Sequence, residues 1–486
     1  MRCLPQSGNN AVSKTGTVSA LLAAEDSGSD VLFERLSGSS AFLWPIARWP
    51  IARALAQAEV KLELRASKPA TKAQVLQRVA RLALPNPASA DNVSSVEHLF
   101  VVSGTTHADA PRGVGNWLSD DFSQALGERA AVVQDAAFDI LTPRVKRPAN
   151  PRTWTYSQAS ARIWRAAQAS PLSDTQRERA TQALSGMFDL FGPLLSQDLR
   201  QRLLGQILPL LELTPHAEAE FIALLDQAQP RAIYMQMAAY GDRSNLIRVA
   251  HDRGISVAEL QHGWIGAAHA AYNFGRAFFD SELTSSLPDT LFTFGQYWGK
   301  DLSFPGRIVP VGKPPLETTC LSAPSYDARQ QRLLVISSEY ETGKLIEAVT
   351  LLKRHLPDEW EVVLRPHPAE RADGVVRFEE ALSHGAVLDP MVDLNASLSA
   401  SRAVVGMTST VLFEALPFNI NVGVIETDLA KYYANAATFP NRLDDEASYC
   451  AFARAIQRPP VTRKSEIDDM WHPNAVATFL TEVSGR

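Results

Sequence analysis

The chain has 486 residues, about three times the length of a typical single domain, so two domains are expected. Hydrophobic residues make up 45% of it, which excludes intrinsic disorder as a general description. The 47 Lys and Arg residues are scattered and are outnumbered by 53 Asp and Glu, giving a net charge of −6. This balance lacks the electrostatic footprint of a nucleic-acid-binding protein. The three cysteines (Cys3, Cys320 and Cys450) lie far apart without a CxxC motif, which excludes a disulfide framework and a zinc knuckle.

The N-terminal region contains no stretch of about 18 consecutive apolar residues, the length that a membrane span needs, and neither does the rest of the chain. We therefore expect a soluble or peripheral protein, and the three scattered cysteines favour a reducing cytoplasm. Residues 1–30 are rich in Ser, Gly and Asn and predict a poorly ordered lead-in, after which Val31–Phe33 would open the first strand. The tandem WPIARWPIAR, Trp44–Arg53, is expected to pack in the protein, with peripheral contact at the inner membrane as the alternative. Its prolines argue against a regular helix.

A proline-rich basic run at 143–152 predicts a loop or an internal linker. Residues 153–228 follow with apolar positions at three- and four-residue steps, so they predict a helical insertion that Gly192-Pro193 kinks or divides.

From residue 231 onward, short apolar runs alternate with helical patterns, which predicts parallel α/β units. The expected strands are Ala232–Met235, Ser256–Leu260, Thr290–Phe294, Ile308–Val311, Leu333–Ser337, Glu361–Leu364, Ala386–Leu388, Arg402–Gly406 and Val422–Ile425.

Two such series, joined by a hinge near residue 313, predict two Rossmann-like domains that face a cleft. Residues 31–312 would form the N-terminal domain with the helical insertion 153–228, and residues 313–486 the C-terminal domain. The segment around Trp471–Val483 could cross back to the first domain.

The strand-to-loop passage ending in His262-Gly263 carries the sharpest local signal for chemistry. Ligands bind at the carboxyl ends of parallel strands, and an imidazole there can accept a proton from an attacking hydroxyl. A hydrogen-bonded structural His in a turn is the alternative interpretation. His269 and Glu259 are further catalytic candidates of the same segment. If the reaction retains configuration, the carboxylate nucleophile would be Glu259 or Asp242. Gln261, Tyr272 and Tyr240 are the candidates for binding an acceptor.

Two further strands of the C-terminal half end in polar loops. Arg365 and His367 lie in a stiff RPHP loop, where a cation and an imidazole suit a phosphate, unless Arg365 pairs with a nearby acid such as Glu370. Thr408, Ser409 and Thr410 follow another strand and open a helix, so their hydroxyls and backbone N–H groups predict an anion site, with ordinary N-capping as the alternative. Glu414, one turn into that helix, is predicted to bind a ribose.

Several common motifs are missing from the sequence. Without GxGxxG or GxxxxGK[ST], a dinucleotide oxidoreductase or P-loop NTPase is poorly supported. Asp-x-Asp, the usual metal clamp of metal-dependent sugar transferases, is absent too, so we expect no metal and no bound cofactor.

Taken together in their order and spacing, these motifs resemble bacterial surface and capsular polysaccharide glycosyltransferases of the GT-B fold. The chain is more distantly similar to CDP-glycerol glycerophosphotransferases and to bacterial polysialyltransferases. The resemblance covers about residues 230–425 and rests on ELQHG, LPDTLFTFGQYW, VGKPPLE, RPHP and TSTVLFEAL. The glycerophosphotransferases usually have Asp-Tyr-Ser-Ser where this chain has Met407-Thr408-Ser409-Thr410, which favours a sugar donor.

The resemblance implies sugar transfer from a nucleotide-activated donor, held by the C-terminal domain, to a glycan or lipid-linked glycan acceptor held by the N-terminal one. His262 matches the proposed general base of the family, His367 and the hydroxyls of 408–410 match its phosphate contacts, and Glu414 matches an acid near the ribose. The alternatives are a sugar-nucleotide epimerase or hydrolase of the same architecture, or a non-catalytic polysaccharide-assembly protein.

Overall fold

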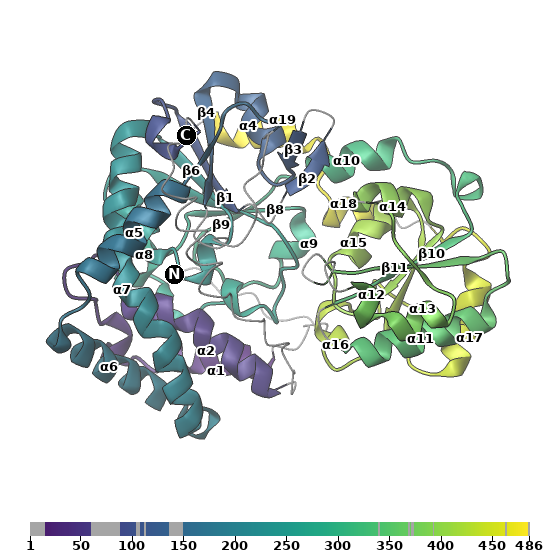
Figure 1. The fold of residues 1–486 in the computed structure, drawn as a ribbon, viewed down its shortest axis with the longest axis horizontal. Coiled ribbons are helices and arrows are strands. Elements are labelled where there is room, and N and C mark those ends of the chain that lie inside the picture. The colour runs from purple at the N-terminus through teal and green to yellow at the C-terminus, as the bar shows by residue number, and fades with distance from the viewer. Residues whose placement is uncertain are drawn as a thin grey trace.

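The strands of the protein form two separate parallel sheets, which lie side by side in Figure 1. The structure is a computed structural model and describes residues 15–59, 88–103, 107–110, 113–135, 149–338, 341–367, 370, 374–391, 393–461 and 464–484. Sheet order is β5-β4-β1-β6-β7-β8-β9 in the first domain and β12-β11-β10-β13-β14-β15 in the second. The prediction of two Rossmann-like α/β domains is therefore confirmed.

The strands of the first sheet are β1 (His98–Ser103), β4 (Ala130–Asp135), β5 (Thr153–Thr155), β6 (Ala232–Met235), β7 (Ser256–Leu260), β8 (Thr290–Thr293) and β9 (Arg307–Pro310). The strands of the second sheet are β10 (Arg332–Ile336), β11 (Glu361–Arg365), β12 (Val387–Leu388), β13 (Ala403–Gly406), β14 (Asn421–Ile425) and β15 (Arg442–Leu443). A small antiparallel hairpin consists of β2 (His107–Ala110) and β3 (Gly113–Asn116).

The helices that precede the second sheet are α1 (Gly16–Asp26), α2 (Leu43–Glu59), α4 (Asp120–Leu126), α5 (Ser157–Ala169), α6 (Asp174–Asp189), α7 (Gln197–Ala228), α8 (Ser244–His251), α9 (Gln296–Gly299) and α10 (Pro314–Leu321). The helices that follow are α11 (Thr342–His355), α12 (Gly374–Arg377), α13 (Glu379–Ser383), α14 (Leu394–Ala400), α15 (Val411–Ala415), α16 (Ala430–Tyr433), α17 (Glu446–Ala455), α18 (Lys464–Met470) and α19 (Ala475–Val483).

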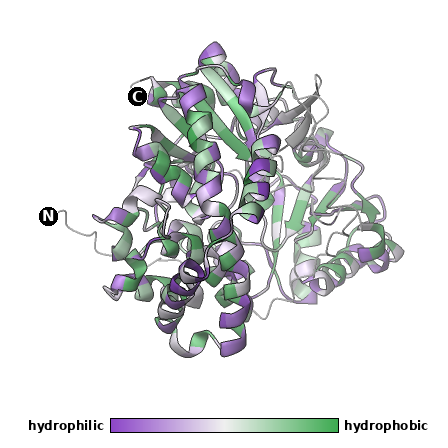
Figure 2. Ribbon diagram, turned by 60° about the vertical axis from the view of Figure 1, so that its left-hand side comes forward, coloured by the Kyte–Doolittle hydropathy of each residue, from purple (hydrophilic) through white to green (hydrophobic). Residues whose placement is uncertain are grey.

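The first sheet is covered on both faces, so its strands β1, β6 and β8 bury side chains that point to either face. Leu99 and Ile233 point to the face covered by α5, α7 and α8. Phe100 and Tyr234 point to the opposite face, where α4 packs together with Phe479 from α19. The last helix of the chain thus crosses back onto the first domain. Figure 2 shows the resulting pattern, with hydrophobic residues concentrated in the strands and hydrophilic ones on the outer helix faces.

The N-terminal helices form a helical core of their own, and here the structure corrects two predictions. Residues 16–26 of the expected lead-in form α1, which buries Val18 and Leu21. Residues 1–14 lie outside the described part. The WPIARWPIAR segment forms the regular helix α2 in spite of Pro50, because burying Trp44, Ile46 and neighbouring side chains against α1, α6 and α7 outweighs the lost hydrogen bond.

Three more predictions concern the residues between α1 and α7. Val31–Phe33 is part of a short 3-10 helix, Asp30–Phe33, so the prediction of a first strand there is wrong. Gly192-Pro193 separates α6 from α7, which confirms the predicted break. Most of the predicted linker at 143–152 lies outside the described residues.

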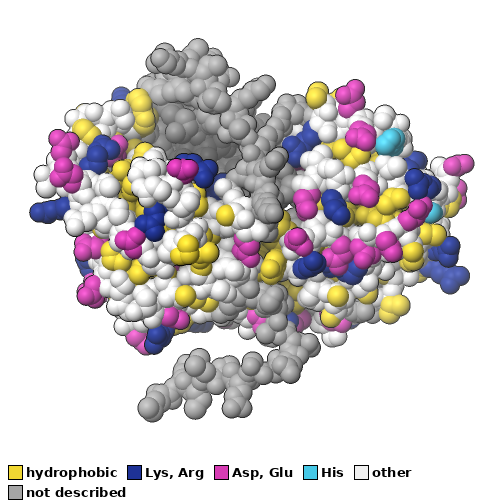
Figure 3. Space-filling view, turned by 90° about the horizontal axis from the view of Figure 1, so that it is seen from below, with side chains coloured by type: hydrophobic (Ala, Val, Ile, Leu, Met, Phe, Trp, Pro, Cys, Tyr) yellow, Lys and Arg dark blue, Asp and Glu magenta, His cyan; other side chains and the backbone are white. Residues whose placement is uncertain are grey.

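The carboxyl edges of the two sheets face each other. After β7, the indole Nε1 of Trp264 donates a hydrogen bond to the carbonyl oxygen of Tyr433 in the second domain (3.1 Å), and the two rings are in contact. After β9, Lys313 forms a buried ion pair with Glu414 of α15 (2.8 Å). Seen from below in Figure 3, acidic and basic side chains are interspersed over both halves of the molecule.

Candidate active site

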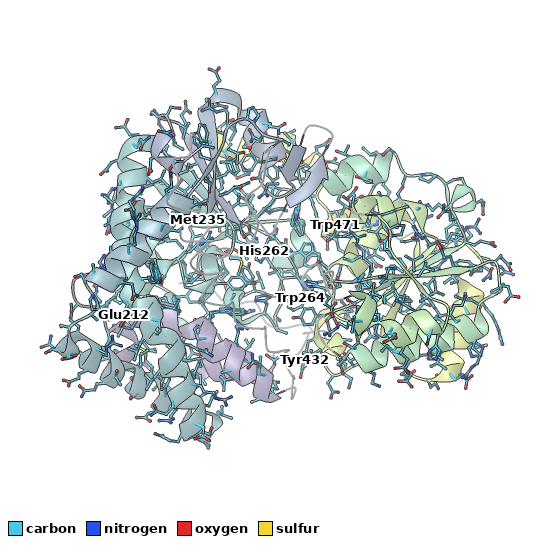
Figure 4. The ribbon with its side chains drawn as sticks, in the orientation of Figure 1. Glu212, Met235, His262, Trp264, Tyr432 and Trp471 are labelled. Atoms are coloured by element: carbon cyan, nitrogen blue, oxygen red, sulfur yellow. The ribbon has the colours of Figure 1, made fainter. Side chains whose placement is uncertain are left out.

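A cluster of titratable rings surrounds the end of β7, on the side of the first domain that faces the second (Figure 4). His262 lies two residues beyond the strand, at the position that the sequence predicts for a ligand site. Its side chain is 17% exposed, and its Nδ1 lies 3.9 Å from the Oε1 of Glu259. That Nδ1 has no hydrogen-bond partner among the residues that the structure describes. Because Nδ1 is itself buried, only the remaining, exposed part of the ring could meet a substrate.

Glu259 lies at the centre of the cluster and has no exposed surface. Its Oε1 accepts a hydrogen bond from the hydroxyl of Tyr272, and its Oε2 accepts one from the backbone N–H of Ala239 (2.7 Å). Tyr272 is fully buried as well. The structure therefore corrects two expectations: a buried Glu259 cannot attack a sugar, and a buried Tyr272 cannot touch an acceptor. Both side chains belong to the buried interior of the cluster.

His269 also differs from its expected catalytic role, because both of its ring nitrogens are engaged. Its Nδ1 accepts a hydrogen bond from the backbone N–H of Ala271 (3.2 Å), so in the neutral ring Nε2 carries the proton and donates it to the hydroxyl of Tyr240 (3.2 Å). Tyr240 in turn is hydrogen-bonded to Tyr272. His269 thus positions Tyr240 at one end of a chain of hydrogen bonds that leads to Glu259.

The indole of Trp49, from α2, completes the cluster, and sequence reasoning missed it. It stacks on His269 (centroids 5.9 Å apart) and meets Tyr240 edge-on (4.5 Å). Close packing of α2 here depends on Gly241, which has a φ of +94°, and a Cβ on this residue would come within 1.9 Å of the Pro45 carbonyl oxygen. The sequence did offer a signal, the repeated tryptophan of WPIARWPIAR. Only the fold could show that Trp49 contacts Tyr240, which lies about 190 residues later in the chain.

Gln261 departs from its predicted role in acceptor binding. The residue is buried, its Oε1 accepts a hydrogen bond from the N–H of Phe294 (2.7 Å), and its Nε2 donates one to the carbonyl of Gly263 (2.8 Å). With both amide atoms satisfied, Gln261 braces the turn that presents His262.

Burial shifts the pKa values of the central groups toward their uncharged forms, and Glu259 is then partly ionised at neutral pH. Loss of hydration raises the pKa of Glu259 to about 7, against the opposing hydrogen bonds from Tyr272 and Ala239. Loss of hydration, with added repulsion from Arg243, lowers the pKa of His262 to about 4. Loss of hydration also lowers the pKa of His269, to about 3. At neutral pH both imidazoles are therefore neutral.

We expect Glu259 to make folding pH-dependent. Its pKa is raised in the folded state, so its contribution to stability is complete below about pH 4.5 and is lost as the pH rises through 7. A shift of this size corresponds to about 3 kcal/mol. Relative to Glu259→Gln, the wild type should lose about that much unfolding free energy between pH 4 and pH 8 in urea titrations. For Glu359→Gln, which alters an exposed residue, the difference in unfolding free energy from the wild type should not change with pH. If the difference for Glu259→Gln does not change with pH either, the raised pKa of Glu259 is contradicted.

In the second domain, the candidate donor site lies where the strand order reverses, between β10 and β13. Thr408, Ser409 and Thr410 follow β13 directly and are partly buried. The Ser409 Oγ accepts a hydrogen bond from the N–H of Val411 (3.2 Å), but the N-cap residue of α15 is Thr410, whose side chain forms no capping hydrogen bond. His367 follows β11 and its side chain is exposed. β11 and β13 flank β10, so these groups share one edge about 10 Å apart.

Arg365 and Glu414 are engaged elsewhere, which corrects their predicted roles at the donor. The guanidinium of Arg365 is buried and pairs with Asp389 (2.5 Å), not with Glu370. The carboxylate of Glu414 is buried against Lys313. Both side chains hold parts of the fold together, because a buried charge needs a partner of opposite sign.

Glu370 holds the loop that carries His367 in place. The carboxylate of Glu370 pairs with Arg377 (2.6 Å), accepts the Ser337 hydroxyl, and accepts the backbone N–H of His367 (3.1 Å). Pro368 lies outside the described residues. This bracing fixes the backbone from which the exposed His367 side chain projects.

No group of three or more His, Cys, Asp or Glu side chains in the described ranges is arranged to hold a metal ion. The expectation of a metal-independent reaction stays a prediction. Within the same ranges, no helix combines the length and the apolar character needed to cross a bilayer.

Comparison with solved structures finds distant similarity in fold. The UDP-GlcNAc 2-epimerase from Neisseria meningitidis, bound to UDP-GlcNAc, has 13% identity and a TM-score of 0.45, covering 80% of this chain and 99% of that one. The UDP-GlcNAc 2-epimerase from Methanocaldococcus jannaschii, in complex with UDP-GlcNAc and UDP, has 10% identity and a TM-score of 0.45, with the same coverage. UGT2 from Phytolacca americana, complexed with UDP-2fluoro-glucose and pterostilbene, has 11% identity and a TM-score of 0.37, covering 80% and 94%.

Comparisons at the level of sequence gave no match, either to a protein-family model or to a curated protein.

Proposed function

We propose that the protein is a glycosyltransferase that moves a sugar from a nucleotide-activated donor to a growing surface polysaccharide or a glycolipid. One observation carries the proposal: a neutral and partly exposed imidazole, that of His262, lies at the carboxyl edge of the first sheet, with its buried Nδ1 facing Glu259. This edge faces the second domain, whose own carboxyl edge presents hydroxyls and an exposed imidazole.

In the proposed reaction, His262 takes the proton of an acceptor hydroxyl while the hydroxyl oxygen attacks the anomeric carbon of the donor sugar. The new C–O bond forms as the bond to the nucleoside phosphate breaks, so the electron pair leaves with the phosphate. Such a direct displacement inverts the anomeric centre. The imidazolium that forms lies 3.9 Å from Glu259, whose carboxylate would stabilise it.

The donor is proposed to bind at the switch point of the second sheet. Ser409, with its neighbouring threonines, would hold phosphate oxygens, and the exposed His367 would stabilise the charge that develops on the leaving phosphate.

We expect His367→Ala and Ser409→Ala each to weaken nucleotide binding by about 1.5–3 kcal/mol, the usual loss for a hydrogen bond to a charged group. Calorimetric titration with the nucleotide measures this, and the acceptor's KM should change less. His384→Ala, which alters an exposed histidine of α13's C-terminal end, serves as the control. Unchanged binding in both test variants would move the donor site elsewhere.

The function itself is tested by a thermal-shift panel of CMP, CDP, UDP, GDP and their sugars, because a ligand at about 100 times its Kd stabilises the folded state by about 2.7 kcal/mol. The nucleotide sugar that stabilises the protein is then incubated with and without glycan acceptors. Transfer only in the presence of an acceptor supports the proposal. Turnover without any acceptor would indicate an epimerase or a hydrolase, and binding without turnover an assembly protein.

A further inference from the structure

A cavity of about 620 Å³ lies between α2 and α7 of the first domain. Its volume is in the range of ligand sites. Tyr240, Met237 and Asp242, from the loop after β6, line its inner end. Tyr240 is 9% exposed and contacts the rings of both His262 and His269. Tyr240 is therefore a wall that the cavity shares with the candidate active site.

The two long walls of this cavity each follow one face of a helix. On α2, lining residues recur at three- and four-residue steps from Ile46 to Gln57, and on α7 from Leu199 to Leu210. Each wall is about 16 Å long at 1.5 Å per residue. Most of the lining is apolar, with Ile46, Trp49, Pro50, Ala54, Leu199, Leu203, Leu210 and Met237. Such a groove has room for a sugar ring and for part of an apolar chain.

Two cations stand at the outer part of this apolar groove. Arg53 and Arg202 both line it, and both are exposed. Neither forms a hydrogen bond or an ion pair with any residue that the structure describes, whereas Arg48, Arg162, Arg177 and Arg200 of the same domain's helices are ion-paired. Two unpaired guanidinium groups on facing helices suit an anionic group, above all a phosphate. Among the described residues of the lining, the only acid is Asp242, at the inner end.

The positions of Trp49 and Arg53 along α2 show which end of the cavity each residue lines. Trp49 stacks on His269 and so marks the end next to the active site. Arg53 follows one turn later, about 6 Å further out. A sugar packed on the indole of Trp49, with its hydroxyl directed toward Tyr240 and His262, would carry its phosphate at Arg53 and Arg202. The leucines of α7 would contact an apolar chain attached to that phosphate.

We propose that the cavity between α2 and α7 is the acceptor subsite, and that it takes a sugar phosphate attached to an apolar chain. This inference rests on the proposed function, because it assigns the acceptor of the same active site. Arg53 and Arg202 bind the phosphate, Trp49 packs against the sugar, and the chain lies along α7.

The test measures calorimetric binding of octyl phosphate, octyl glucoside and inorganic phosphate to the full-length protein. We expect octyl phosphate to bind at least about tenfold more tightly than either of the others, because it combines the anion with the chain. The double variant R53Q/R202Q should weaken octyl phosphate binding by at least about tenfold. Arg179→Gln, which alters an exposed and unpaired arginine of α6, should leave it unchanged. In turnover assays the double variant should raise the acceptor's KM and leave kcat unaltered.

Equal binding of octyl phosphate by the wild type and R53Q/R202Q would overturn the inference, and inorganic phosphate bound as tightly as octyl phosphate would indicate a simple anion site instead. The thermal shift with the donor nucleotide separates this from the proposed function. If the nucleotide stabilises the wild type and octyl phosphate fails to bind, only the acceptor subsite is wrong. If no nucleotide stabilises the protein, the proposed function falls.

Discussion

Replacing His262 by glutamine is expected to lower kcat by about 10²–10⁴-fold, the usual contribution of a general base. Glutamine can form hydrogen bonds from the same turn, but it cannot accept a proton at neutral pH. Because Gln261 and not His262 braces that turn, the fold and the donor site should persist. Thermal shift with the donor nucleotide should therefore equal that of the wild type while single-turnover rates collapse.

His269→Gln is the matched control for this experiment, since the two imidazoles belong to one cluster and are both partly buried. His269 has both ring nitrogens engaged, so its replacement should disturb Tyr240 and cost less activity than the loss of His262. A His262→Gln variant that keeps more than about a tenth of the wild-type rate, with collapse in His269→Gln, would transfer the role of base to His269. If both variants stay active, Asp242 and Asp280 are the next acids to test.

Removing one partner of the ion pair between Lys313 and Glu414 is expected to destabilise the protein by about 3–5 kcal/mol, because the other charge stays buried without a partner. The side chains are only 9% and 6% exposed, and the ammonium group also lies over the ring of Trp117 (4.5 Å). Lys313→Met and Glu414→Leu should each show this loss in urea unfolding. The double variant should be more stable than either single one, because it buries no charge.

The same pair distinguishes a structural Glu414 from one that binds ribose. If the carboxylate acts on Lys313 alone, the double variant should bind nucleotide with the wild-type affinity in calorimetry. A loss of more than about tenfold in nucleotide affinity, in a double variant that unfolds as cooperatively as the wild type, would return Glu414 to the donor site.

Much of the second half of the fold could be predicted from the sequence, because parallel strands buried on both faces are continuous apolar runs. Ala232–Met235 and Ser256–Leu260 match β6 and β7 residue for residue, and the remaining predicted strands differ by one or two residues at their ends. β1 and β4 were missed, although β1 pairs with β6 at the centre of the first sheet. Helix α2 was missed because a proline usually breaks a helix, and only its burial among α1, α6 and α7 compensates for that.

For the candidate site too, the sequence predicted some features and only the structure showed the others. The sequence by itself placed His262, His367 and Thr408–Thr410 just after strands, since the carboxyl ends of parallel strands share one edge. It could not decide which of the neighbouring polar residues face a substrate. Gln261, Glu259 and Tyr272 are all buried, and Arg365 and Glu414 are bound to partners at Asp389 and Lys313. Burial and pairing come from contacts between segments far apart in the chain, so only the tertiary structure could decide them, as it did for Trp49 and for the cavity that it lines.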